Sequence, residues 1–114
     1  MDIKNSRMPV MDKNDALKIS KRYLRKLKRS DFRFSEAWLF GSFAKNTQHN
    51  DSDIDLAIVL DDQVPHTFES DVKLMVFRKG EETLIEPHLF SREEFDSNLP
   101  LVNQIVRFGE KINL

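Results

Sequence analysis

The sequence predicts a small domain of the α/β (α+β) class, and three observations lead to this prediction. Segments with helical spacing of apolar residues alternate with segments of strand-like spacing. A glycine follows three of these segments, and the length of 114 residues suits one domain. We therefore expect residues 1–114 to form a single domain. Met1–Met11 is expected to be a loose N-terminal arm, because it has no periodicity and contains Pro9.

The charge balance and the absence of cysteine exclude several classes of function. The chain has 18 Lys and Arg against 19 Asp and Glu, so its net charge of −1 gives no overall attraction for nucleic acid. Without cysteine there is no disulfide or thiolate chemistry, which fits a reducing compartment. No apolar run is long enough to span a membrane, and the N-terminus lacks a hydrophobic signal region. We therefore expect a cytoplasmic protein.

The first predicted element is a basic amphipathic helix, which Asp12 or Asn14 can cap and which extends to about Arg29. Its cations favour a solvated helix whose long basic side chains shield their apolar neighbours. The alternative is a landing site for an acidic partner or RNA. The apolar stripe consists of Leu17, Ser20 or Tyr23, Leu24 and Leu27.

A strand and a turn follow this helix. The strand is expected over Ser35–Phe40, and Gly41 then allows a tight turn with close approach of the backbone. Ser42 begins a short helical turn, whose free backbone N–H groups suit a phosphate and whose hydroxyl can add to them. Lys45 opens the polar loop that comes next. It either neutralises a triphosphate or is a solvated loop residue.

Two aspartates open the second strand, which is expected over Asp53–Leu60. Residues two apart in a strand share a face at a spacing of about 6.5–7 Å, so Asp53 and Asp55 are expected to lie together. Between Asn46 and Val72 there are seven acids and no Lys or Arg, so this pair needs a cation or a shared proton. Carboxylates suit Mg²⁺ or Mn²⁺, which often also bind nucleotide phosphates. The alternative is a strand that begins with two solvated acids.

A second long helix is expected from Thr67 to about Lys79, with Gly80 as its stop. Its apolar residues are expected to face the core: Phe68, Val72, Met75 and Val76. His49 and His66 have no partner residues at metal-ligand spacing, so we expect both to be surface histidines.

A third strand is expected over Thr83–Phe90, and Pro87 restricts it to an edge or a bend because proline has no N–H for the ladder. Glu86 shares its face with His88, and an acid among apolar residues needs a partner. The last segments are expected to be a capped helix start over Ser91–Phe95, a helix over Pro100–Arg107 and, at Asn113-Leu114, a closure against the sheet.

A family resemblance rests on the order of these motifs. Gly41-Ser42 follows a strand, and Asp53-Ile54-Asp55-Leu56 follows ten residues later. A lone acid, Glu86, lies on a later strand. The combination resembles the nucleotidyltransferase fold of the DNA polymerase beta superfamily, and more narrowly the minimal nucleotidyltransferases (MNT-type antitoxins), which are single domains of about this size. In place of the second glycine of Gly-Ser-x-Ala-x-Gly this chain has Asn46, which tolerates the left-handed conformation.

The resemblance implies a small mixed sheet flanked by helices, and it assigns roles to the site residues. ATP would be the substrate. Two divalent ions, Mg²⁺ or Mn²⁺, would be cofactors, with Asp53, Asp55 and Glu86 as metal ligands and catalytic residues. The nucleotide would be bound by Gly41, Ser42, Lys45 and Ser52. His88 would border the site, since it shares the face of Glu86.

The implied activity is transfer of AMP from ATP to a hydroxyl. Minimal nucleotidyltransferases often act as the antitoxin of a HEPN-domain protein, so such a toxin is the expected partner. The basic helix around Lys21 to Arg29 is a candidate contact. The alternative is a binding module that blocks its partner by occlusion, without catalysis. Transfer to a small molecule such as an aminoglycoside, and modification of RNA ends, are further alternatives.

Overall fold

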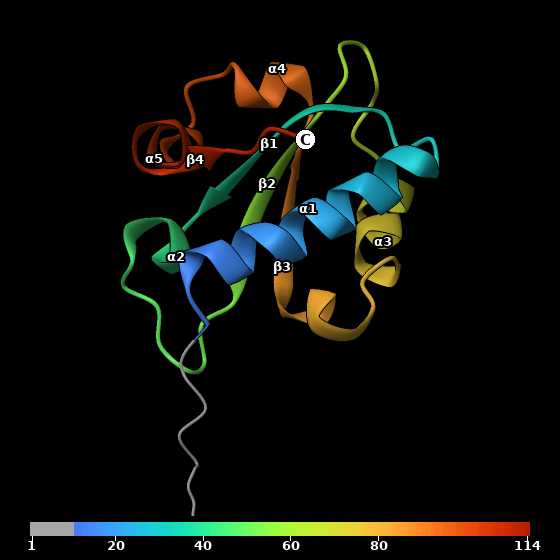
Figure 1. Ribbon diagram of the computed structural model, residues 1–114. Helices are drawn as coiled ribbons and strands as arrows, with labels where there is room; N and C mark the ends of the chain where they lie inside the picture. Colours follow the sequence, from blue (N-terminus) through green and yellow to red (C-terminus); the bar gives the residue numbers. More distant parts are fainter. Residues whose placement is uncertain (1–10) are drawn as a thin grey trace, which may run out of the picture.

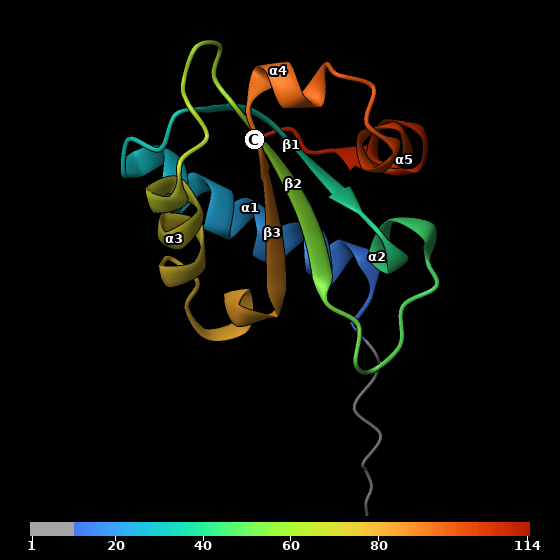
Figure 2. The same cartoon turned by 180° about the vertical axis from the view of Figure 1, so that it is seen from behind.

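The computed structural model describes residues 11–114, which form a four-stranded sheet with helices on both faces (Figures 1 and 2). The strand order is β3-β2-β1-β4. Strand β1 (Phe34–Phe40) pairs antiparallel with β2 (Ile54–Leu60) and with β4 (Glu110–Lys111), whereas β2 and β3 (Ile85–Phe90) run parallel. The small mixed sheet flanked by helices, expected from the sequence, is confirmed.

Helices cover the two faces of the sheet in pairs. Helices α1 (Lys13–Arg29) and α3 (Phe68–Val76) pack on one face, and α4 (Arg92–Phe95) and α5 (Pro100–Phe108) pack on the other (Figure 2). Each face has its own apolar core, so β2 is buried on both sides over 56–60. A strand buried on both faces must read as a continuous apolar run, and the sequence LAIVL does so.

The first helix matches the prediction closely. Asp12 caps it through a reciprocal capping box with Asp15. Its buried residues are Ala16, Ile19, Ser20, Tyr23, Leu24 and Leu27, so both Ser20 and Tyr23 belong to the inner face. Of the expected loose arm, residues 1–10 lie outside the described residues. Met11 is half-buried against the core, which contradicts the prediction at that position.

The orientation predicted for α3 is wrong. The four residues expected in the core are instead exposed: Phe68 (81%), Val72 (42%), Met75 (46%) and Val76 (61%). The helix packs through Leu74, which is 1% exposed, and through the half-buried Phe77 just after it. Tyr23 of α1 donates a hydrogen bond to the Leu74 carbonyl, which holds the Leu74 side of α3 against the core. Periodicity identifies an apolar stripe, but here a shorter apolar pair on the opposite face makes the tertiary contact.

The third strand begins later than predicted. Residues Gly80–Leu84 form a 3₁₀ helix, η1, and the strand starts at Ile85 rather than at Thr83. Glu82 in η1 is only 2% exposed, and its carboxylate accepts hydrogen bonds from Arg22 and from the Lys79 N–H. Lys26 of α1 completes the cluster at 2.5 Å. Because two cations of α1 are used in this way, its basic surface is in part structural.

The ends of the sheet are short or interrupted. Strand β3 is an edge strand, which confirms the prediction made from Pro87. At the other edge the C-terminal closure involves Glu110–Lys111 and the Ile112 N–H, which donates to the Ala37 carbonyl at 2.8 Å. It therefore lies before the expected Asn113-Leu114. Within residues 11–114, no helix is both long enough and apolar enough to cross a membrane.

Candidate functional site

The turn after β1 brings the backbone against an acidic side chain. Gly41 has φ of +74°, and a Cβ at this position would overlap the Asp55 carboxylate, so only glycine fits. Helix α2 (Ser42–Lys45) follows directly. Asn46 ends it in the left-handed conformation with φ of +58°, as expected for asparagine in the place of the family's glycine. The sharp turn is thus retained, and it packs directly on Asp55.

The strand register places the predicted site residues of β2 and β3 next to one another, near the starts of the two strands. In the antiparallel pair, Phe40 lies opposite Asp55. In the parallel pair, Asp55 lies opposite Glu86 and Ala57 lies opposite His88. Residues in register on neighbouring strands point to the same face of the sheet. The lone acid of the third strand is therefore beside the acidic motif of the second.

Three ligand groups converge at this point. One ligand atom from each of Asp55, Glu86 and His88 lies within 4.8 Å of the other two. The Nε2 atom of His88 is 3.4 Å from Asp55 Oδ1 and 3.6 Å from Glu86 Oε1. The His88 ring packs against the ring of Phe40, with centroids 5.0 Å apart. Among residues 11–114 no other group of His, Asp and Glu side chains has this metal-ligand spacing.

Two carboxylates of the cluster, those of Asp55 and Glu86, are close enough to affect each other's ionisation. A hydrogen bond with Asp55, followed by desolvation and by the Asp55 charge, raises the pKa of Glu86. The hydrogen bond to Asp55 also raises the pKa of His88, against the opposing effect of burial. Two acids this close favour a shared proton or a bound cation. The donor set of two carboxylates and one imidazole fits a divalent metal ion.

Asp53 lies beside this cluster but not within it. It is exposed and immediately precedes β2, which begins one residue later than expected. Its negative charge contributes to the raised pKa of Glu86, so the two side chains are near enough to interact. The structure thus brings Asp55 together with Glu86 and His88, whereas Asp53 is outside the group with metal-ligand spacing.

The other predicted nucleotide-binding residues surround the turn and the loop. Ser42 is half-buried, and its carbonyl accepts the Thr47 N–H at 2.9 Å. The ammonium group of Lys45 lies 5.4 Å from the centroid of the Phe108 ring on α5. The Ser52 hydroxyl accepts the His49 N–H at 2.9 Å, so it stabilises the loop that leads to Asp53. His49 is exposed, as expected.

A second histidine also lies between two acids, and this arrangement was missed. His66 was expected to be a surface residue without partner residues at metal-ligand spacing, yet its Nδ1 is 2.8 Å from Glu94 Oε1 and its Nε2 is 2.9 Å from Asp71 Oδ1. Burial lowers the pKa of His66, but the hydrogen bonds to Glu94 and Asp71 raise it by more. Sequence spacing gave no signal, because Glu94 is 28 residues away.

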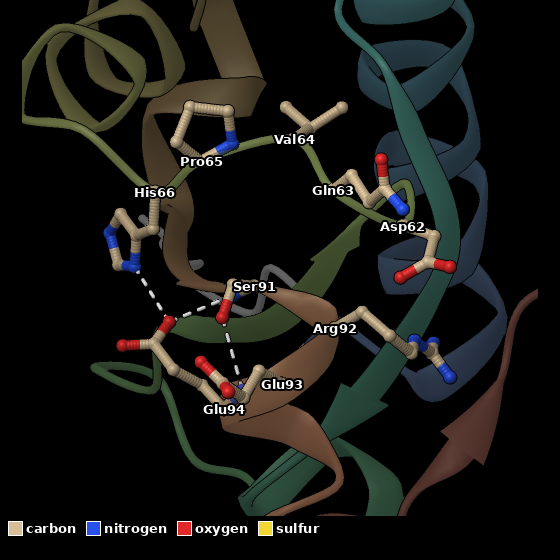
Figure 3. A pocket seen from close by; sticks show the side chains of 9 residues that line it. All are labelled: Asp62, Gln63, Val64, Pro65, His66, Ser91, Arg92, Glu93 and Glu94. Carbon is tan, nitrogen blue, oxygen red and sulfur yellow. Dashed lines mark hydrogen bonds and ion pairs between the residues drawn. The ribbon is translucent and has the colours of Figure 1, made fainter.

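This second cluster borders a pocket at the opposite ends of β2 and β3. The pocket has a volume of about 520 Å³, and Figure 3 shows His66 and Glu94 joined at its rim. Its lining comes from the segments after the two strands: Asp62, Gln63, Val64, Pro65, His66, Ser91, Arg92, Glu93 and Glu94. The Arg92 guanidinium is paired with Glu36 at 2.6 Å. The parallel strand pair thus has a histidine–carboxylate cluster at each end.

The fold and the first cluster together define a nucleotidyltransferase-type domain. The sequence profile of the family described as "Polymerase beta, Nucleotidyltransferase" matches residues 21–112. The chain belongs to this family, which confirms the resemblance stated above. No match is found among curated protein sequences.

Solved structures agree with this assignment. A candidate nucleotidyltransferase from Sulfolobus solfataricus superposes with a TM-score of 0.60 at 21% identity, over 75% of each chain. A toxin–antitoxin with AMP-PNP has a TM-score of 0.53 at 25% identity, over 82% of this chain and 72% of that one. A mutant of the toxin–antitoxin MntA-HpeT has a TM-score of 0.50 at 22% identity, over 82% and 71%. The likeness to the first and third shows the fold alone.

Proposed function

We propose that the protein transfers AMP from ATP to a hydroxyl of a partner protein. The observation that carries this proposal is the convergence of the Asp55 and Glu86 carboxylates beside the Gly41-Ser42 turn. Membership of the nucleotidyltransferase family supports the reaction type. The nucleotide analogue in the similar toxin–antitoxin supports ATP as the donor.

In the proposed reaction, the acceptor oxygen forms a bond to the α-phosphorus of ATP. The bond from that phosphorus to the bridging oxygen breaks, and pyrophosphate leaves. Two divalent ions, Mg²⁺ or Mn²⁺, would neutralise charge on the attacking and leaving oxygens when bound. Asp53 and Asp55 would hold these ions, together with Glu86. The Glu86 carboxylate, which lies beside Asp55 on the neighbouring strand, would take the proton of the acceptor hydroxyl.

The turn residues would orient the donor. The backbone N–H groups at Gly41-Ser42 and the Ser42 hydroxyl would bind the phosphates, with Lys45 and Ser52 as further contacts. For Lys45 this requires its ammonium group to leave the Phe108 ring. A cation–π contact at an exposed position contributes only about 0.5–1 kcal/mol, so a triphosphate can displace it.

The partner would be a toxin, with a HEPN-domain protein as the proposed identity. The similar toxin–antitoxin with AMP-PNP supports a toxin partner. This reaction depends on positioning the acceptor. A protein partner bound at the site would do so by presenting a side-chain hydroxyl, such as that of a tyrosine. Binding alone would give the second candidate function, an antitoxin that acts by occlusion.

One experiment separates the two functions. The protein is co-expressed with the protein encoded beside it, incubated with α-labelled ATP and Mg²⁺ or Mn²⁺, and the partner is analysed by mass spectrometry. The proposal predicts an adenylyl group on the partner. The Asp53→Asn variant should fold normally and transfer nothing. A stable complex with no modification would instead establish occlusion. Equal modification by wild type and Asp53→Asn would contradict the proposed role of the acidic pair.

A further inference from the structure

We propose that His88 supplies a nitrogen ligand to the metal ion of this site, so that the site selects Mn²⁺ over Mg²⁺. The inference deepens the proposed function and rests on it for the presence of a metal ion near Asp55 and Glu86. It concerns a residue that the acidic motif of the family does not include. Three observations carry it: convergence on a single nitrogen, the distances, and the fixed ring.

The first observation is the convergence. Both carboxylates of the cluster face the same atom, Nε2 of His88. An imidazole that only ties acids together can use its two nitrogens in opposite directions, as His66 does with Asp71 and Glu94. A metal ion, by contrast, requires ligand atoms from several residues close together around a common point. Only the cluster at His88 meets this condition within the described chain.

The second observation is the distances. Charge-assisted hydrogen bonds between nitrogen and carboxylate are typically about 2.7–2.9 Å long. The His88 separations of 3.4 and 3.6 Å are longer than this range, so the hydrogen bond with Asp55 is a long one, whereas the pairs at His66 fall within the range. Two ligand atoms that are each about 2.1 Å from one ion lie about 3.4 Å apart at a tetrahedral angle and about 3.0 Å apart at a right angle. The spacing at His88 therefore suits atoms that share an ion.

The third observation is the fixed ring. His88 is half-buried, and its ring meets the Phe40 ring edge-on at an interplanar angle of 66°. The pairing of β2 with β3 places His88 opposite Ala57, which is two residues after Asp55. The imidazole is thus held in place before any ion binds, which lowers the entropic cost of using it as a ligand.

The choice of ion follows from ligand chemistry. Mg²⁺ prefers oxygen ligands in a near-ideal octahedron and gives up its water reluctantly, so an imposed imidazole adds little to its affinity. Imidazole binds first-row transition ions well, and carboxylates suit Mn²⁺. A site with two carboxylates and one imidazole therefore gains affinity for Mn²⁺ through His88, whereas Mg²⁺ depends on the carboxylates.

The test measures coordination directly, without turnover. Mn²⁺ is bound to the full-length protein, and pulsed electron paramagnetic resonance detects any nitrogen coupled to the ion. We expect a ¹⁴N signal that changes to that of ¹⁵N when the protein is labelled with [¹⁵N]histidine. This arm needs no substitution, so it is independent of any folding defect. A Mn²⁺ complex without nitrogen coupling would overturn the proposal, and so would a failure of the protein to bind Mn²⁺.

Two variants then measure selectivity. His88→Gln should lose the nitrogen signal and bind Mn²⁺ at least about tenfold more weakly, while its Mg²⁺ affinity changes by less than about threefold. His66→Gln, the matched change at the other histidine, should alter neither. An equal loss of affinity for Mn²⁺ and Mg²⁺ in His88→Gln would mean that His88 only positions the carboxylates, and it would contradict the proposal. If nitrogen coupling is present but no adenylyl transfer occurs, the proposed function fails and the proposal for His88 stands. If transfer occurs without nitrogen coupling, the proposed function stands and the proposal for His88 fails.

Discussion

His66 and His88 each lie between two carboxylates, at opposite ends of the parallel pair of strands, yet their geometry differs. His66 uses both ring nitrogens, at 2.8 and 2.9 Å, and so joins the Asp71 of α3 to the Glu94 of α4. His88 faces both of its acids with one nitrogen, at 3.4 and 3.6 Å. The same three chemical groups therefore make a closed tie at one end and an open cluster at the other.

The difference teaches that the direction of the ligand atoms matters more than the composition of a cluster. At His66 the hydrogen-bonding capacity of the ring is used internally, so the cluster connects segments of the fold. At His88 the carboxylates of Asp55 and Glu86 repel each other, and this repulsion is relieved only by a shared proton or by a bound cation. A pocket of about 520 Å³ lies beside His66, whereas the group of side chains with metal-ligand spacing lies at the other end.

The largest effect is expected from Asp55→Asn, since this carboxylate touches every part of the open cluster. Metal binding should be lost, and transfer should fall by about 10³-fold, which corresponds to about 4 kcal/mol. Stability should not fall in the metal-free protein, because removal of one charge relieves repulsion with Glu86. Calorimetric metal titration and the transfer assay measure both. The matched change Asp71→Asn, in the closed tie, should leave metal affinity unaltered; if the two variants behave alike, the comparison fails.

Gly41→Ala should have the next largest effect. It places a Cβ in the left-handed region and against the Asp55 carboxylate, at an expected cost of about 1–3 kcal/mol in the free energy of unfolding. Gly80→Ala is the matched control, because Gly80 has φ of +57° but no atom near its Cβ position. Urea denaturation of both variants isolates the overlap with Asp55. Equal losses would show that backbone strain alone accounts for the lower free energy of unfolding of Gly41→Ala.

A smaller effect is expected from His66→Gln. Loss of the tie between α3 and α4 should lower the free energy of unfolding by about 0.5–1.5 kcal/mol, the usual net contribution of such a hydrogen bond. His88→Gln should cost less stability in the absence of metal, because its contacts are longer. Urea denaturation in the presence of a chelator compares the two variants. A larger loss in His88→Gln would reverse the roles assigned to the two residues.

The smallest effect concerns pH. Because the pKa of His66 in the folded protein is raised above its ordinary value, its contribution to stability is fully present below about pH 6.5 and is lost as pH rises through the raised pKa. Two carboxylates face the ring, those of Asp71 and Glu94. The hydrogen bond from the Ser91 backbone N–H and the one with His66 lower the pKa of Glu94. The wild type should therefore lose a few tenths of a kcal/mol more than His66→Gln between pH 6 and pH 8. Parallel slopes for the two proteins in metal-free denaturation would contradict this assignment.

The parts of the site that the sequence could predict are those with local signals. Gly41 follows a strand and Asp55 begins one, so each is visible in a window of a few residues. The pairing of Glu86 with Asp55 could be anticipated because strand periodicity assigns each to a face. The roles of Asp53, Ser42, Lys45 and Ser52 at a bound nucleotide stay predictions.

The parts that could not be predicted depend on contacts between distant segments. His66 and Glu94 are 28 residues apart, and Arg22 and Glu82 are 60 apart, so no spacing rule connects them. The inner face of α3 was chosen wrongly for a related reason. Helical periodicity shows how apolar residues group around an axis, but which group faces inward depends on what packs there, and here that is the side with Leu74.

The two borders of the sheet also affect how the protein behaves among many copies of itself. An unpaired strand offers a row of free donors and acceptors to which another chain can add, and this is a common route to aggregation. Here β4 is only two residues long and covers Trp38 and Leu39 of β1, so the rest of β1 also belongs to this border. The other border, β3, carries Pro87 in its middle, where the missing N–H interrupts the row of donors. Pro87 therefore limits strand addition at β3, and β4 limits it by covering part of β1.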